Sequence, residues 1–115
     1  MPVPRLVVTF TIPAGQFLSQ GVDCSEGYFA RVQMPLQWTS ANLSFQVSDD
    51  NITYYDLVDK MGAEALIPVV AGTAVMLREE PWSSAIGWWK FRSGSVRGPV
   101  VQQAARTFKV TLAPS

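Results

Sequence analysis

The chain has 115 residues, with nine basic and nine acidic side chains, a single cysteine and no histidine. Only 16% of its residues are charged, and without a basic excess a nucleic-acid partner is disfavoured. The lack of histidine removes the commonest general base and zinc ligand, and one cysteine allows no internal disulfide.

Apolar and polar residues alternate with a period of two along much of the chain, which predicts half-buried antiparallel strands. The regular segments are residues 5–12, 28–34, 43–48 and 107–113. Less regular strands are expected at 52–58, at 86–93, weakly at 16–22, and as two short strands within 65–78, divided at residues 71–73. In the second regular segment the alternation places Tyr28, Ala30, Val32 and Met34 on one face, opposite Phe29, Arg31 and Gln33.

Roughly eight short strands, separated by turn residues and without a long helical period, predict an all-β fold. The first and last strands are both cleanly amphipathic. We therefore expect an antiparallel two-sheet β-sandwich of jelly-roll type rather than an up-and-down barrel. Helical turns are expected only near residues 77–86 and 98–106. No linker or repeat divides the chain, so residues 1–115 are expected to form one domain, with residues 1–4 as a short N-terminal arm.

The acidic loop at Asp49, Asp50 and Asn51 has two interpretations. Its oxygen atoms suit calcium, but the alternating acidic pattern, glycine and terminal glutamate of a calcium loop are missing. Asp and Asn also favour hairpin turns, because they tolerate left-handed backbone angles and bond their own main chain. We therefore interpret the loop as an exposed turn, followed by Tyr54 and Tyr55 with one side chain packed inside and one outside.

No familiar catalytic arrangement is present. A serine nucleophile would lack its histidine, and no phosphate-binding loop occurs. We therefore expect a protein that is not an enzyme and that has no cofactor or metal. Lys90 and Arg92 share a strand face and are expected to form exposed pairs with Asp56 or Asp59. Cys24 is expected to be a buried, unreactive thiol. We also expect no signal peptide and no membrane-spanning segment.

Four tryptophans are the strongest sign of a contact surface. Trp88 and Trp89 must point to opposite faces of a strand, so only one of them can enter the core. Trp38, in a turn, either caps the end of the core or binds a ligand. Trp38, Trp82 and the loop Asp49–Asp50–Asn51 form the candidate interaction surface.

Residues 45–59 and 87–95 resemble a hairpin and a late strand of discoidin-like, galactose-binding-type sandwich domains. The whole chain is similar to small structural proteins of tailed bacteriophages, prophages and gene transfer agents. The segments that carry this second likeness are Thr11–Gln16, Val22–Gly27, Met34–Trp38, Ser48–Leu57, Val70–Gly72, Arg92–Gly94 and Gln102–Arg106. Asn51 stands where the hairpin usually has glycine, and sugar-binding residues of the discoidin type are not matched.

The resemblance implies a structural component of a virion, assembled in the host cytoplasm. Capsid decoration, a head-spike base and a head–tail accessory role are all compatible with it. Its expected partners are the major capsid protein, a spike or fibre subunit, or further copies of itself. Nucleic acid and membranes are not expected partners. The alternative is a carbohydrate-binding module that recognises host-surface glycan through Trp38, Trp82 and the acidic loop.

Overall fold

The computed structural model describes residues 6–24, 27–77, 80, 83–85 and 87–113. Within them the chain forms ten strands and no helix, and the strands pair antiparallel in two sheets. The all-β prediction is therefore confirmed. The count exceeds the expected eight because four strands have only two residues.

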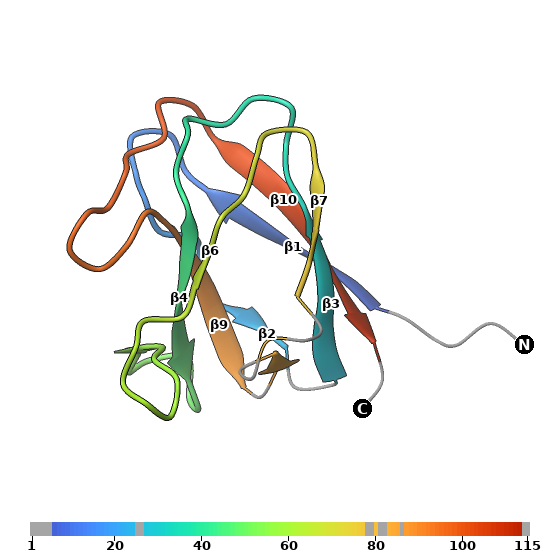
Figure 1. The fold of residues 1–115 in the computed structure, drawn as a ribbon, viewed down its shortest axis with the longest axis vertical. Helices are drawn as coiled ribbons and strands as arrows, with labels where there is room; N and C mark the ends of the chain where they lie inside the picture. Colours follow the sequence, from blue (N-terminus) through green and yellow to red (C-terminus); the bar gives the residue numbers. More distant parts are fainter. Residues whose placement is uncertain (1–5, 25–26, 78–79, 81–82, 86, 114–115) are drawn as a thin grey trace, which may run out of the picture.

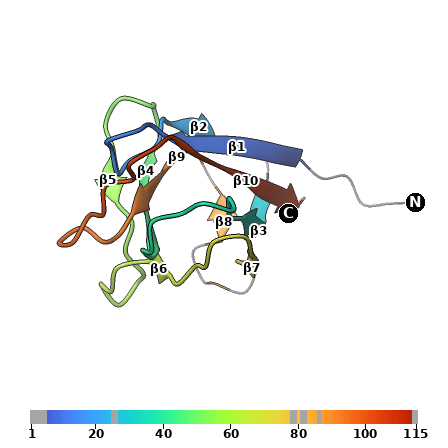
Figure 2. The same ribbon diagram turned by 90° about the horizontal axis from the view of Figure 1, so that it is seen from above.

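The first sheet has the order β1 (Leu6–Ile12), β10 (Arg106–Ala113), β3 (Gly27–Gln33) and β7 (Ala74–Met76), and β8 (Ser84–Ala85) also pairs with β3. The second sheet has the order β2 (Val22–Asp23), β9 (Trp88–Ser93), β4 (Leu43–Ser48) and β5 (Tyr55–Asp56), and β6 (Leu66–Ile67) also pairs with β4. The two sheets face each other, and β1 lies at one edge of the first sheet (Figures 1 and 2). Of the two terminal strands, β10 therefore lies in the body of a sheet and β1 does not.

Phenylalanine side chains join the two sheets. Phe10, Phe29 and Phe108 project from the first sheet, and Phe45 and Phe91 from the second. The ring centroids of Phe10 and Phe91 are 4.3 Å apart, and those of Phe45 and Phe91 are 4.8 Å apart. All five rings are almost completely buried. The core therefore lies between the sheets, where the alternating patterns predicted it.

A β-bulge changes which side chains of β3 face the core. Thr111 lies opposite Arg31, but Leu112 lies opposite Phe29, so Ala30 is an extra residue on β3. An extra residue reverses the alternation on one side of it. Phe29 is therefore completely buried together with Val32. The prediction that Phe29 lies opposite the core face was wrong.

The less regular strands are shorter than expected. Only Tyr55–Asp56 of the segment 52–58 is a strand, whereas the predicted division of residues 65–78 into two strands is confirmed by β6 and β7. The helical turn expected near residues 98–106 was wrong, since this segment forms bends, and Gln102 there forms a bridge to Gln16. The helical turn expected at 77–86 lies partly outside the described residues, and its described part contains β8.

Candidate functional site

The loop after β4 is a hydrogen-bonded turn. The Ser48 hydroxyl accepts hydrogen bonds from the backbone N–H groups of Asp50 (3.2 Å) and Asn51 (3.0 Å). The Asp50 carboxylate accepts one from the Ser48 hydroxyl and one each from the N–H groups of Ile52 and Thr53, all at 2.9 Å. Asn51 has a φ of 61°, the left-handed conformation that asparagine tolerates. The turn interpretation of this loop is confirmed.

The Asp50 carboxylate is a hydrogen-bond acceptor within the turn. The backbone hydrogen bond from Thr53, then that from Ile52 and the bond from Ser48, hold the pKa of Asp50 below its usual value. These donors stabilise the charged form. Among the described residues, no group of three potential ligands from His, Cys, Asp and Glu comes close enough together to hold a metal ion.

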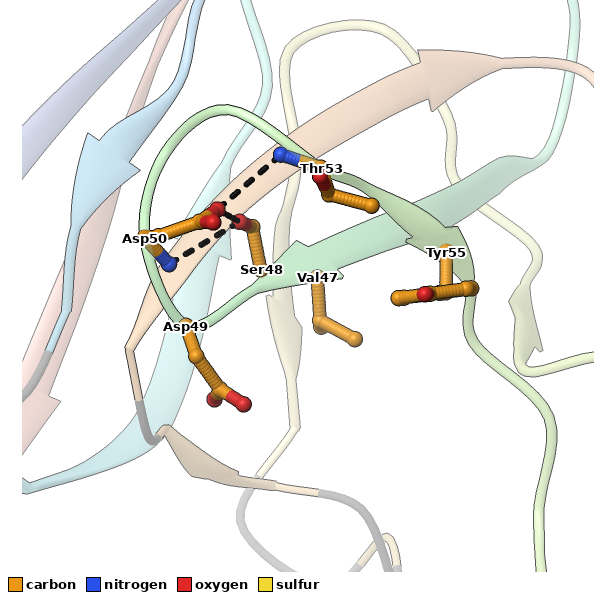
Figure 3. A pocket seen from close by; sticks show the side chains of 6 residues that line it. All are labelled: Val47, Ser48, Asp49, Asp50, Thr53 and Tyr55. Atoms are coloured by element: carbon orange, nitrogen blue, oxygen red, sulfur yellow. Dashed lines mark hydrogen bonds between the residues drawn. The ribbon is translucent and has the colours of Figure 1, made fainter.

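A shallow hollow of about 350 Å³ lies beside this turn, and Figure 3 shows the six side chains that line it: Val47, Ser48, Asp49, Asp50, Thr53 and Tyr55. The Tyr55 side chain is 69% exposed. Asp49 points away from the hydrogen bonds of the turn, whereas the Asp50 carboxylate turns into them (Figure 3). The hollow therefore offers a carboxylate and an aromatic ring to solvent.

The two tyrosines after the turn do not divide between core and solvent as expected. Tyr54 lies over the outer face of the second sheet, where the Nζ atom of Lys90 is 4.3 Å from its ring centroid. Its hydroxyl donates to the side chain of Asn51 and leaves no room for a β-carbon at Gly21. Tyr55 is exposed because β5 is a short strand at the edge of the sheet. Neither ring enters the core, so that prediction was wrong.

Arg92 is buried rather than exposed. Its side chain is 4% accessible and forms an ion pair with Asp56, and a second carboxylate, that of Glu64, lies 3.8 Å away. Asp59 does not pair with Arg92. Its carboxylate accepts hydrogen bonds from the backbone N–H groups of Met61 (2.8 Å) and Ala63 (3.0 Å) in its own loop. The prediction that Arg92 is exposed was therefore wrong. The predicted pairing with Asp56 is confirmed, but Glu64 is a second partner that was not predicted.

Glu64 also binds the loop that follows β9. Its carboxylate accepts the backbone N–H of Val96 at 2.9 Å. Sequence reasoning missed this residue, because nothing in the spacing of Glu64 shows that its loop folds back over β4 and β9. The Arg92 cluster, defined as Arg92, Asp56 and Glu64, therefore connects three segments on the outer face of the second sheet.

Gln102 is a further buried polar residue whose contacts the sequence interpretation did not predict. It is completely buried, and its amide nitrogen donates to the carbonyl of Thr39 (3.0 Å) and the hydroxyl of Ser93 (2.8 Å). Its amide oxygen accepts the N–H of Thr39 (2.9 Å) and the Nε–H of Arg106 (3.1 Å). Every hydrogen-bonding position of the amide is thus used. The Gln102–Arg106 spacing, noted in the sequence, was the available signal.

Trp38 packs against the core at the other end of the sandwich. Its indole N–H donates to the carbonyl of Ala41 at 3.1 Å, and its ring meets that of Phe108 edge-on at 6.3 Å. Trp38 precedes β4 and the Asp49–Asn51 turn follows it, and six strand residues separate the two by about 20 Å. The structure does not bring these residues into one surface. Trp82, the remaining member of the candidate surface, lies outside the described residues.

Two further predictions are confirmed. Trp89 is buried in the core, and Trp88, its neighbour on β9, is half-buried on the opposite face. Cys24 is almost completely buried, and burial, with a smaller contribution from Asp23, raises the pKa of its thiol to about 12. The thiol is therefore protonated at neutral pH and is a poor nucleophile.

Comparison of the chain with protein-family models, with curated proteins and with solved structures gave no match. In the described part of the chain, no helix is long and apolar enough to cross a membrane.

Proposed function

We propose that the protein is a non-enzymatic structural component of a phage-like virion, acting through contacts with other virion proteins. Capsid decoration, a head-spike base and a head–tail accessory position are the roles that this proposal covers. We also propose a jelly-roll of the discoidin type for its fold. The chain's passage between sheets supports this topology, since β1, β2, β3 and β4 alternate between the two sheets, and so do β9 and β10.

One observation carries the functional proposal: large apolar side chains are exposed along one continuous segment. Ile52 is 83% exposed, Met61 84%, Tyr55 69% and Val58 49%. We call these four residues the hairpin patch. The four lie within ten residues of the chain, in the edge strand β5 and the segments on either side of it, and exposed apolar side chains that gather at one place on a surface mark protein contact sites. The low charge density and zero net charge of the chain favour such association.

The direct test uses particles of the phage or prophage that encodes the protein. We expect the protein in gradient-purified particles by mass spectrometry, and we expect added purified protein to sediment with particles that lack it. A double variant, Ile52→Glu with Met61→Glu, should lose this co-sedimentation. The matched control, Leu36→Glu with Val70→Glu, changes two residues that are 88% and 66% exposed outside the hairpin patch. Absence from particles, together with no co-sedimentation of the wild type, would refute the proposal.

The hollow beside the turn favours carbohydrate binding as a second candidate. An exposed aromatic ring and a carboxylate that line the same hollow form an arrangement that can stack on a sugar ring and bond its hydroxyls. The residues involved are Tyr55 and Asp49, since Trp38 packs on Phe108 instead. Tyr55→Ala should abolish any shift in NMR titrations with sugars while leaving the fold intact. Trp38→Ala is unsuitable for this purpose because it removes a contact with the core.

A further inference from the structure

The edge strands of the two sheets differ in how well they are protected from pairing with another chain. β7 has three residues, and β2, β5 and β6 have two each. β1 has seven residues, and none of Leu6–Ile12 is charged or a proline. Proteins usually protect edge strands by shortness, charge, proline or bulges. Within the described chain, β1 is the long edge without these protections.

Hydrogen bonds define which part of the β1 edge is open. The Thr11 N–H donates to the side chain of Gln20 at 3.1 Å, so it points away from β10. Because backbone groups alternate along an antiparallel strand, the N–H and C=O groups of Thr9 and Val7 point the same way. No hydrogen bond among the described residues uses these outward groups. The open edge therefore runs from Leu6 to Thr9, and Gln20 closes it at Thr11.

We propose that a second copy of this chain pairs with β1 in antiparallel orientation across a two-fold axis at Val8. Val7 of each copy would exchange two hydrogen bonds with Thr9 of the other. Among registers that pair the open residues with described residues alone, only this one uses both Val7 and Thr9 and leaves Thr11 with Gln20. A register centred on Thr9 would place Val7 opposite Thr11, whose N–H already donates to the side chain of Gln20.

A second copy fits this edge better than a charged partner does. The strand carries no charge, so two copies of it do not repel each other, and the net charge of the chain is zero. Leu6 and Val7 are 48% and 47% exposed, and pairing removes part of their apolar surface from water. The two-fold register also satisfies the same groups on both copies, as an isologous interface requires. As a contact within a virion, this pairing rests on the proposed function.

A pair of matched lysine substitutions tests the interface. Thr9, Lys109 and Gln33 form one cross-strand row on the outer face of the first sheet, with Thr9 at the edge and Gln33 two strands away. Thr9→Lys and Gln33→Lys each place a lysine opposite Lys109, so their effects on the protomer are matched. We expect Thr9→Lys to weaken dimerisation about tenfold or more in analytical ultracentrifugation, and Gln33→Lys to leave it unchanged.

A cysteine at the two-fold axis tests the register. Val8 faces its own copy at a non-hydrogen-bonded position, where Cα atoms lie about 4.5 Å apart, within the range for disulfides. Val8→Cys should give a disulfide-linked dimer on mild oxidation, whereas Gln33→Cys should not. The native Cys24 does not interfere because it is buried.

The inference is overturned by a wild-type protein that is monomeric at every concentration, or by equal effects of the two lysine variants. It is also overturned if Thr9→Lys abolishes particle binding of a monomeric wild type, since the edge then takes a segment of another protein. Failure of the proposed function gives a different result: the protein dimerises through β1 but is absent from particles.

Discussion

Removing the two acids of the Arg92 cluster should destabilise the protein more than removing Arg92 itself. The double substitution Asp56→Asn with Glu64→Gln leaves a guanidinium whose side chain is 4% exposed without a countercharge. Stranding a buried charge costs about 3–5 kcal/mol. Because Asp56 and Glu64 are 42% and 27% exposed, water reaches the cluster, and we expect the low end, about 3 kcal/mol.

Arg92→Met has a different consequence. Methionine fills the space of the arginine stem, and the two carboxylates that remain are exposed enough to be hydrated. We therefore expect a loss of only about 1 kcal/mol. The asymmetry arises because one side of the ion pair is buried and the other is half-exposed.

Urea unfolding at pH 7, monitored by tryptophan fluorescence, measures the free energy of unfolding of both variants. The m-value, the dependence of that free energy on urea concentration, should stay constant. Asp49→Asn is the control for losing a carboxylate, since Asp49 is exposed at the turn and should change the free energy of unfolding by less than about 0.5 kcal/mol. The reasoning is refuted if Arg92→Met costs more than the double substitution, or if the double substitution costs no more than Asp49→Asn.

Five other tests have defined outcomes. The pKa of Asp50 is lowered in the folded state, so the charged carboxylate stabilises the fold above its unfolded pKa, and this stabilisation is lost as pH falls through its folded pKa. The free energies of unfolding of the wild type and Asp50→Asn should therefore converge in acid unfolding curves. Gly94→Ala should cost about 3 kcal/mol in urea unfolding, because its φ is 92° and a β-carbon would lie 2.8 Å from the backbone nitrogen of Val100 and closer still to the carbonyl oxygen of Gly98. Gly15→Ala, with a φ of 78° but open space, should cost about 1 kcal/mol. Thr111→Val should stabilise by about 1 kcal/mol in the same assay, since the buried hydroxyl has no hydrogen-bond partner among the described residues. Cys24 should resist iodoacetamide at pH 8 and react after unfolding, as read by mass spectrometry.

Period-two alternation was a sufficient guide to β1 and β10, whose pairing with each other has no bulge. The inward positions of β1 and β10, such as Phe10 and Phe108, follow the pattern because one face of each strand meets the core and the other meets water. The pattern failed at Ala30, where a bulge inserts one residue. A bulge depends on the partner strand as well as on local sequence, so the spacing of apolar residues in β3 alone did not indicate it.

The candidate site was less predictable because it depends on how loops fold over the sheets. Ser44, on the outward face of β4, is completely buried, and its hydroxyl donates to the carbonyl of Gly94 at 2.7 Å. Arg92 is buried in the same way, on the opposite strand position. An alternating pattern assigns both residues to solvent. Long-range loop contacts of this kind have no signature in the local sequence. The sequence drew attention to the exposed Asp50, whereas in the structure the buried charge is that of Arg92.

The outer face of the second sheet is covered by side chains from its neighbouring loops, whereas the outer face of the first sheet is more open. This difference limits where a partner can bind. On the second sheet, Tyr54 lies over Lys90, and the carboxylates of Asp56 and Glu64 lie at Arg92. A partner on that face would have to displace contacts that bury a guanidinium, which costs free energy. On the first sheet, the outward side chains of Thr9 and Lys109 are exposed. Since the backbone of β1 is open beside them, partner contacts on the described surface should gather at the β1 edge and at the hairpin patch, leaving the Arg92 cluster to hold the fold together.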